Sequence, residues 1–289
     1  MKKISGLSEI IQDYDYYIFD IWGVIHDGSK LYPNVLETLS YLRKNHKKIC
    51  FLSNAPRRAS KVESILNKFG INNQLYDFVL SSGESTFAEL KDNQDNDYKN
   101  FGKKYFYIGP EKDLDLLEGL FYQKVDELDK ADFVLNTGFD NDNSTIHEKL
   151  PLAIQASKFR LPMLCVNPDL IVVKQNGEEM ICAGALALEY KKLGGDVHYH
   201  GKPFKRVYEM VLEKFSMPNK DSFLAIGDGL ETDIKGANDF KINNVLVSGG
   251  ILAKELKINF WQDANEILLK KVFDKYNIFP NYIISNLKI

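Results

Sequence analysis

The feature that constrains this chain most is a short apolar run that ends in a single acid. Aromatic and β-branched residues fill positions 16–19, Asp20 follows them, and Gly23 comes three positions later. Such a run favours a buried strand. A carboxylate at its end is costly unless a cation or a hydrogen-bond donor meets it. Because ligands bind beyond the carboxyl ends of strands in open parallel sheets, we predict that Asp20 is a nucleophile.

Strand-like and helix-like segments alternate along the rest of the chain. Apolar runs predict strands at residues 48–52, 77–82, 105–108, 133–136, 163–166, 222–226 and 244–247. Amphipathic segments predict helices after the first two strands, near 112–120 and 146–159, and over 180–193 and 204–215. This alternation predicts an α/β fold with a doubly wound, Rossmann-like parallel sheet. Since two such series follow one another, we expect two domains.

Composition and charge narrow the class of protein. The chain has 289 residues, a net charge of -3 and 44% hydrophobic residues, which is typical of a soluble globular protein. Its scattered lysines give no electrostatic reason to expect nucleic acid or a membrane surface as a partner. Three cysteines without metal-type spacing, and no signal-like apolar run, predict a cytoplasmic protein. The polar segment 92–100 is predicted to be a surface loop.

Polar residues follow several of the predicted strands and suggest one chemistry. Asp20, Ser53 and Asp228 stand at strand ends, Lys202 precedes a helix, and Asp233 lies one turn beyond Asp228. Each alone is as readily a helix cap, a turn residue or a surface lysine. Together they suit phosphoryl transfer, in which a carboxylate attacks phosphorus while other acids hold Mg²⁺. A hydroxyl and a lysine then neutralise the phosphate oxygens.

The same residues stand in four segments that resemble the motifs of one enzyme family. The segments are Asp20-Ile21-Trp22-Gly23-Val24, Leu52-Ser53-Asn54, Gly201-Lys202-Pro203, and Gly227-Asp228 with Thr232-Asp233. Their order resembles that of haloacid dehalogenase-like (HAD) hydrolases. The insert before Gly201, with Asn167-Pro168-Asp169, resembles the cap of the type IIA, NagD-like branch. The resemblance implies a HAD core domain of residues 1–81 and 200–289 and an inserted α/β cap domain of residues 82–199.

The resemblance also implies roles for individual residues. Asp20 would be the nucleophile, with Ser53 and Lys202 holding phosphate. Mg²⁺ would be bound by Asp20, Asp228, Asp233 and the backbone carbonyl of Trp22. The implied substrate-binding residues are Trp22, Gly23, Ser53, Asn54, Asn167, Asp169 and Lys202. The implied activity is a Mg²⁺-dependent phosphatase of a small phosphorylated metabolite, in the sugar or nucleotide phosphate class, and a homodimer is a possible assembly.

One departure from the family pattern bears on the mechanism. Phosphatases of this family usually carry a second Asp two positions after the nucleophile, where this chain has Trp22. That Asp acts as general acid and base, a contribution of roughly 10²–10⁴ in rate. His26 and Asp27, further along the loop, are candidate substitutes. The alternative is a nearly inert phospho-ligand-binding homologue, and Trp22 is also open to being core filler that points away from the site.

Two further functions fit less well. Residues 227–232 approach the G-x-G-x-x-G pattern of dinucleotide sites, but the last glycine is missing and Asp228 would face the pyrophosphate. Dehalogenation by Asp20 would need no acid. However, the carboxylates of Asp228 and Asp233 make a poor receptor for a departing halide.

Overall fold

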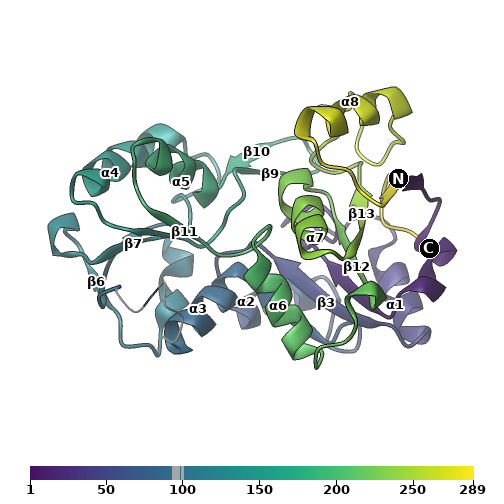
Figure 1. Ribbon diagram of the computed structural model, residues 1–289, viewed down its shortest axis with the longest axis horizontal. Coiled ribbons are helices and arrows are strands. Elements are labelled where there is room, and N and C mark those ends of the chain that lie inside the picture. The colour runs from purple at the N-terminus through teal and green to yellow at the C-terminus, as the bar shows by residue number, and fades with distance from the viewer. Residues whose placement is uncertain (93–97, 99–100) are drawn as a thin grey trace.

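The computed structural model describes residues 1–92, 98 and 101–289. Most of the loop predicted at 92–100 therefore lies outside the described residues. Figure 1 shows two α/β units side by side, with the ends of the chain in the same unit. We call residues 82–199 the cap region and the remainder the core region.

The core region is organised around a seven-stranded parallel sheet, in the order β1-β14-β13-β12-β2-β3-β4. Its strands are β1 (Lys2–Lys3), β2 (Tyr16–Phe19), β3 (Lys48–Ser53), β4 (Phe78–Ser81), β12 (Phe223–Gly227), β13 (Asn243–Val247) and β14 (Tyr282–Ile284). Strand β2 lies between β12 and β3, with Phe19 level with both Ile226 of β12 and Phe51 of β3. The carboxyl ends of these three strands therefore meet at one edge.

Helices cover both faces of this sheet. They are α1 (Val35–Lys44), α2 (Ala59–Lys68), α6 (Lys205–Lys214), α7 (Lys235–Phe240) and α8 (Glu266–Tyr276). Buried side chains of α1 and α2, such as Leu39 and Leu66, pack on one face. Those of α6 and α7, such as Val211 and Phe240, pack on the other. The sheet is thus doubly wound, as predicted.

The cap region contains a second parallel sheet of five strands, in the order β11-β8-β7-β5-β6. They are β5 (Lys104–Ile108), β6 (Gln123–Val125), β7 (Phe133–Asn136), β8 (Met163–Cys165) and β11 (Val197–Tyr199). Helices α4 (Ile146–Lys158) and α5 (Ala183–Lys192) pack on one face, and α3 (Ser82–Asp92) contributes Leu90 to the other. An antiparallel hairpin of β9 (Ile171–Val173) and β10 (Glu179–Ile181) extends towards the core region (Figure 1).

Two predicted helices differ in the structure. The segment near 112–120 forms a 3₁₀ helix over Glu111–Leu117 rather than an α-helix. The segment 180–193 begins as strand β10, and its helix starts only at Ala183. Here Met180 pairs with Val172, so a tertiary strand contact overrides the local helical pattern.

Two further observations concern the state of the cysteines and the length and polarity of the helices. Cys50, Cys165 and Cys182 are buried and unpaired. Among the described residues, no helix is both long and apolar enough to cross a membrane.

Candidate active site

Three aspartates come together where β2 and β12 end. Asp20 directly follows β2, Asp228 directly follows β12, and Asp233 lies in a π-helical turn over Leu230–Ile234. Each offers a carboxylate oxygen, and these oxygens lie within 4.8 Å of one another. Asp228 and Asp233 are buried. The structure thus brings the three acids together at one edge of the sheet.

Lys202 lies among these acids and is itself buried. Its Nζ donates to Asp20 Oδ1 at 2.5 Å and to Asp233 Oδ1 at 2.7 Å. Burial alone would lower the pKa of this amine, but the Asp20 and Asp233 carboxylates override that effect and raise it. Lys202 thus stays charged at neutral pH.

The acids outnumber the lysine, and the excess charge shifts their protonation. Burial, then repulsion from Asp233, raises the pKa of Asp20 well above its usual range, against the lowering effect of Lys202. The same causes raise the pKa of Asp228 to about 7. Three clustered carboxylates and one ammonium leave negative charge for a further cation to neutralise. Because their ligand atoms are oxygens, the residues present fit a hard divalent cation such as Mg²⁺.

Glycines allow the backbone to approach these acids closely. Gly23 has φ +87°, and a Cβ there would come within 2.0 Å of Asp228 Oδ2. Its N–H donates to the carbonyl of His26 at 3.3 Å. Gly23, predicted to bind substrate, therefore packs against Asp228, and it does not line the pocket in front of Asp20.

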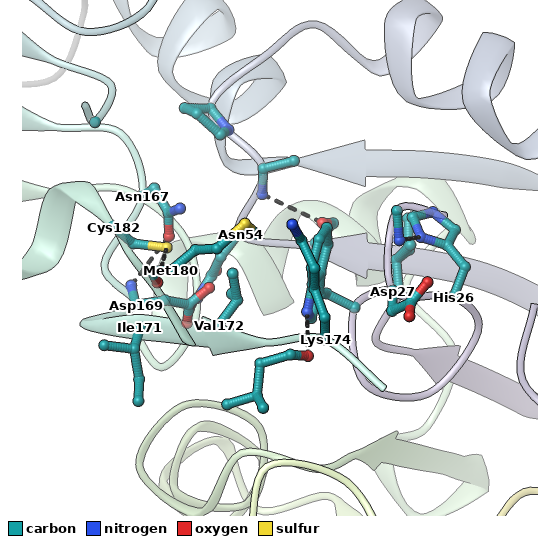
Figure 2. Close-up of a pocket in the computed structure, with 18 of the residues that line it drawn as sticks. His26, Asp27, Asn54, Asn167, Asp169, Ile171, Val172, Lys174, Met180 and Cys182 are labelled. Carbon is teal, nitrogen blue, oxygen red and sulfur yellow. Dashed lines mark hydrogen bonds between the residues drawn. The ribbon is translucent and has the colours of Figure 1, made fainter. Parts of the chain in front are cut away.

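Ser53 is the last residue of β3, Asn54 directly follows it at the same edge, and both line this pocket. Asn54 Oδ1 accepts the backbone N–H of Lys202 at 2.7 Å, and its Nδ2 donates to Asp169 Oδ1 at 2.8 Å. Asn167 Oδ1 in turn accepts the N–H of Asp169 at 3.0 Å. Figure 2 shows Asn54, Asn167 and Asp169 gathered on one side of the pocket, with His26 and Asp27 on the other. Apart from Gly23, the predicted site residues of the core and cap regions thus line one cavity.

Trp22 lines the same pocket, and its side chain is bound to the cap region. The indole Nε1 donates to the backbone carbonyl of Val173 in β9 at 2.9 Å. A Cβ at Gly28 would lie 2.9 Å from the Trp22 ring, so the ring packs closely on that glycine. Trp22 is therefore not core filler, and it carries no group that could transfer a proton at pH 7.

His26 and Asp27 are poorly suited to replace the missing acid. Burial lowers the pKa of His26 to about 4, and its Nδ1 accepts the N–H of Gly28 at 2.9 Å. Hydrogen bonds from Ser29, Lys30 and the N–H of Gln175 hold the pKa of Asp27 at about 2, although its burial acts the other way. Both side chains therefore hold in place the loop that contains them.

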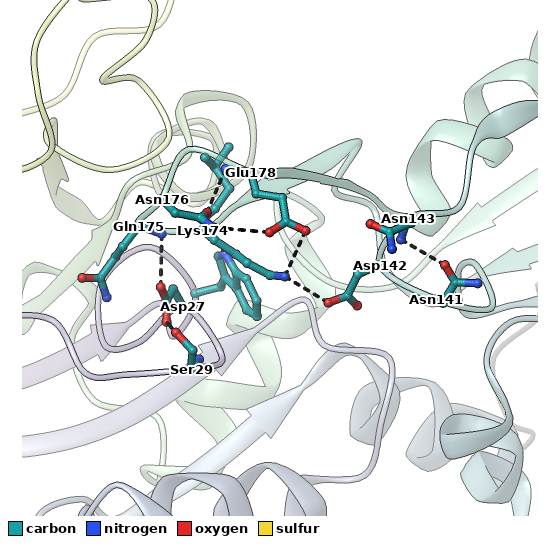
Figure 3. Close-up of polar contacts among 11 residues, drawn as sticks. Asp27, Ser29, Asn141, Asp142, Asn143, Lys174, Gln175, Asn176 and Glu178 are labelled. Carbon is teal, nitrogen blue, oxygen red and sulfur yellow. Dashed lines mark hydrogen bonds and ion pairs between the residues drawn. The ribbon is translucent and has the colours of Figure 1, made fainter.

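The hairpin β9–β10 lines the cap side of the pocket and was not predicted from the sequence. Figure 3 shows Lys174 between Asp142 and Glu178, while Gln175 faces Asp27 of the core region. Lys174 Nζ lies 3.1 Å from Asp142 Oδ2 and 3.2 Å from Glu178 Oε1. The β-branched run Ile171–Val173 was the available signal for this hairpin. The cavity measures about 800 Å³.

Arg57 and Arg58, which directly precede α2, are paired with acids. Arg57 Nε lies 3.3 Å from Asp113 Oδ1 of the cap region, and Arg58 Nε lies 2.8 Å from Glu84 Oε2. Arg57 therefore joins the two regions, and both charges are already compensated.

Comparison with known proteins agrees with this geometry. The model of the haloacid dehalogenase-like hydrolase family matches residues 17–123, and a second, HAD-hydrolase-like model matches residues 199–271. The two ranges cover more than half of the chain and contain Asp20, Ser53, Lys202, Asp228 and Asp233. The chain belongs to the haloacid dehalogenase-like hydrolases.

Relatives of this HAD-like hydrolase match over most of its length. The 4-nitrophenylphosphatase of Schizosaccharomyces pombe is 25% identical, over 99% of this chain and 97% of its own. Phosphoglycolate phosphatase 1A, chloroplastic, of Arabidopsis thaliana is 25% identical over 86% of this chain and 73% of its own. A solved haloacid dehalogenase-like hydrolase from Brucella suis 1330 superimposes with a TM-score of 0.83 at 29% identity, covering 98% of this chain and 99% of its own. The fold therefore extends through both regions.

Proposed function

We propose that this hydrolase is a Mg²⁺-dependent phosphatase of a small phosphorylated metabolite, with Asp20 as its nucleophile. The observation that carries the proposal is the cluster of Asp20, Asp228 and Asp233 around the ammonium of Lys202. The phosphatases among its relatives support the reaction class. A cavity of about 800 Å³ suits a small molecule, for which sugar and nucleotide phosphates are the expected class.

Each residue of the site has its own role in the proposed reaction. Asp20, Asp228, Asp233 and the carbonyl of Trp22 would hold Mg²⁺, which would offset the repulsion between the phosphate and the nucleophile. Lys202 orients Asp20 through its 2.5 Å contact and offers its positive charge to phosphate oxygens. The hydroxyl of Ser53 would donate to a further phosphate oxygen. Asp20 then forms an aspartyl-phosphate, which water hydrolyses.

A Mg²⁺ titration against a panel of phosphate esters tests this function. Sugar, aryl and acyl phosphates should be hydrolysed only when Mg²⁺ is present. The control variant Asp20→Asn keeps the size of the side chain and should lose turnover. A chain that binds Mg²⁺ but hydrolyses none of these compounds would contradict the proposal.

Trp22 favours one alternative, a protein that binds a phosphorylated ligand with little turnover. No carboxylate stands two positions after Asp20, and the indole is bound to Val173 instead. Such a protein would bind inorganic phosphate with Mg²⁺ in calorimetry, and its turnover of alkyl phosphates would rise sharply in Trp22→Asp. A wild-type chain that turns over alkyl phosphates rapidly would exclude this alternative.

A further inference from the structure

The phosphatase proposed above needs a group that gives a proton to the leaving oxygen, and Trp22 cannot be that group. Acidic side chains line the cavity at eight positions of the described chain: Asp20, Asp27, Asp113, Asp142, Asp169, Glu178, Asp228 and Asp233. These eight carboxyl groups are therefore the candidates for the proton donor.

Most of these carboxyl groups already have other partners in the structure. Asp20, Asp228 and Asp233 form the candidate metal cluster. Five acids remain. Four of them, all but Asp169, are each held by a cation or by several hydrogen-bond donors. Asp113 pairs with Arg57, Asp142 and Glu178 pair with Lys174, and Asp27 accepts from Ser29, Lys30 and Gln175.

Asp169 differs from the other acids in what it contacts. Its carboxylate accepts a hydrogen bond from Asn54, a neutral amide, at 2.8 Å. Its backbone is fixed on both sides, since its N–H donates to Asn167 Oδ1 and its carbonyl accepts the N–H of Gly184 at 3.1 Å. Figure 2 shows its side chain turned towards Asn54. Asp169 is thus a rigidly placed acid that no cation hydrogen-bonds among the residues that the structure describes.

Hydrogen bonds also connect Asp169 to the nucleophile. Asn54, which donates to Asp169, accepts the backbone N–H of Lys202, and the Nζ of Lys202 holds Asp20. Asp20 stands on the core side of the cavity and Asp169 on the cap side. Because the attacking and leaving oxygens lie roughly in line across phosphorus, a leaving oxygen would face away from Asp20, towards the cap region.

We propose that Asp169 is the general acid and base of this hydrolase, an inference that rests on the proposed phosphatase function. In the first step the Asp20 oxygen bonds to phosphorus, the bond from phosphorus to the leaving oxygen breaks, and that oxygen takes the Asp169 proton. In the second step water attacks the same phosphorus and gives a proton to Asp169. The bond to Asp20 then breaks, and its electron pair returns to Asp20. Asp169 is then protonated again and Asp20 is free of phosphate, so the enzyme has returned to its starting state.

The charges around Asp169 agree with this role. Burial raises its pKa from 3.8 to about 6, while Lys202 lowers it and Asp233 raises it. Asp228 on the core side and Cys165 and Cys182 on the cap side also interact electrostatically with it. A carboxyl that titrates near neutrality is suited both to donating and to accepting a proton.

The variant Asp169→Asn tests the inference, because Asn can still accept the hydrogen bond from Asn54. With an alkyl ester such as glycerol 2-phosphate, kcat/KM should fall by roughly 10²–10⁴. With 4-nitrophenyl phosphate, whose leaving group needs no proton, one nitrophenolate per active site should appear in a burst. Slow turnover should follow, because the base for the second step is gone. Asp140→Asn, an exposed cap-region acid paired with Lys149, is the matched control and should show neither effect.

Several outcomes separate the inference from the function on which it rests. Wild-type activity with equal activity in Asp169→Asn, or an equal loss on both esters without a burst, would overturn the role of Asp169 alone. A wild-type chain inactive on both esters with Mg²⁺ would overturn the proposed function and this inference with it. Should Asp169→Asn fail to fold, Asp169→Glu should retain alkyl ester hydrolysis above the level of Asp169→Ser. Equal activity in those two variants would overturn the inference.

Discussion

The indole Nε1 of Trp22 donates a hydrogen bond to the backbone carbonyl of Val173, which joins the loop after strand β2 to the hairpin of the cap region. Two residues further along the hairpin, the N–H of Gln175 donates to Asp27 Oδ2 at 3.1 Å. Together these two contacts fix the hairpin over the cavity. Trp22, two positions after Asp20, therefore fastens the cap region to the core region.

Trp22→Phe tests this fastening, because it keeps an aromatic ring on Gly28 but removes the N–H. The hairpin at residues 171–181 should exchange its amide hydrogens faster, with stability lowered by about 1 kcal/mol for the lost hydrogen bond. Trp261→Phe is the matched control, since the other tryptophan packs on Tyr32 outside the hairpin. Unchanged exchange in Trp22→Phe would show that the hydrogen bond does not hold the hairpin.

Asp27 should matter for stability rather than for proton transfer. Its carboxylate accepts from the N–H groups of Ser29, Lys30 and Gln175. Asp27→Ala leaves these donors without that partner, so the free energy of unfolding should fall by about 1–3 kcal/mol. Urea unfolding measures this change. A pH profile of kcat/KM that is altered by Asp27→Ala would instead point to a catalytic Asp27.

Trp22→Asp should restore turnover where Asp169 has been removed. In the Asp169→Asn background, a carboxylate at position 22 offers a second source of the proton, so alkyl ester hydrolysis should recover by about tenfold or more. In the wild-type background the gain in alkyl ester hydrolysis should be small, because Asp169 already supplies the proton. This non-additivity is the expected signature of two groups that perform one task. A large gain in wild type, with none in the Asp169→Asn background, would contradict the account.

The pH dependence of stability offers an independent measure of Asp169. Its pKa is raised from 3.8 to about 6, so between these values the unfolded chain releases a proton that the folded chain keeps. This contribution therefore lowers stability as pH rises through that window and levels off above it. The free energy of unfolding of Asp169→Asn should rise relative to that of wild type across the window, by at most about 3 kcal/mol. Urea unfolding in the presence of a chelator, on both sides of the window, checks the sign, and a constant difference would contradict it.

Much of the core region could be predicted because its sequence signals are local. The run at 49–52 is continuous and apolar, and Ser53, Asp20 and Asp228 mark the ends of three adjacent parallel strands. The hairpin was missed because β9 is three residues long and the turn that follows it is polar. The direction of the Trp22 side chain was open as well. Its partner Val173 lies 151 positions away, and no local pattern encodes such a contact.

The central claim, that Asp20 receives the phosphoryl group, is tested most directly by mass spectrometry of the acid-quenched protein. After brief incubation with Mg²⁺ and 4-nitrophenyl phosphate, the account predicts a phosphoryl group on the peptide that contains Asp20, and none in Asp20→Asn. An unmodified Asp20 peptide in a protein that turns over the ester, or undiminished turnover in Asp20→Asn, would contradict it.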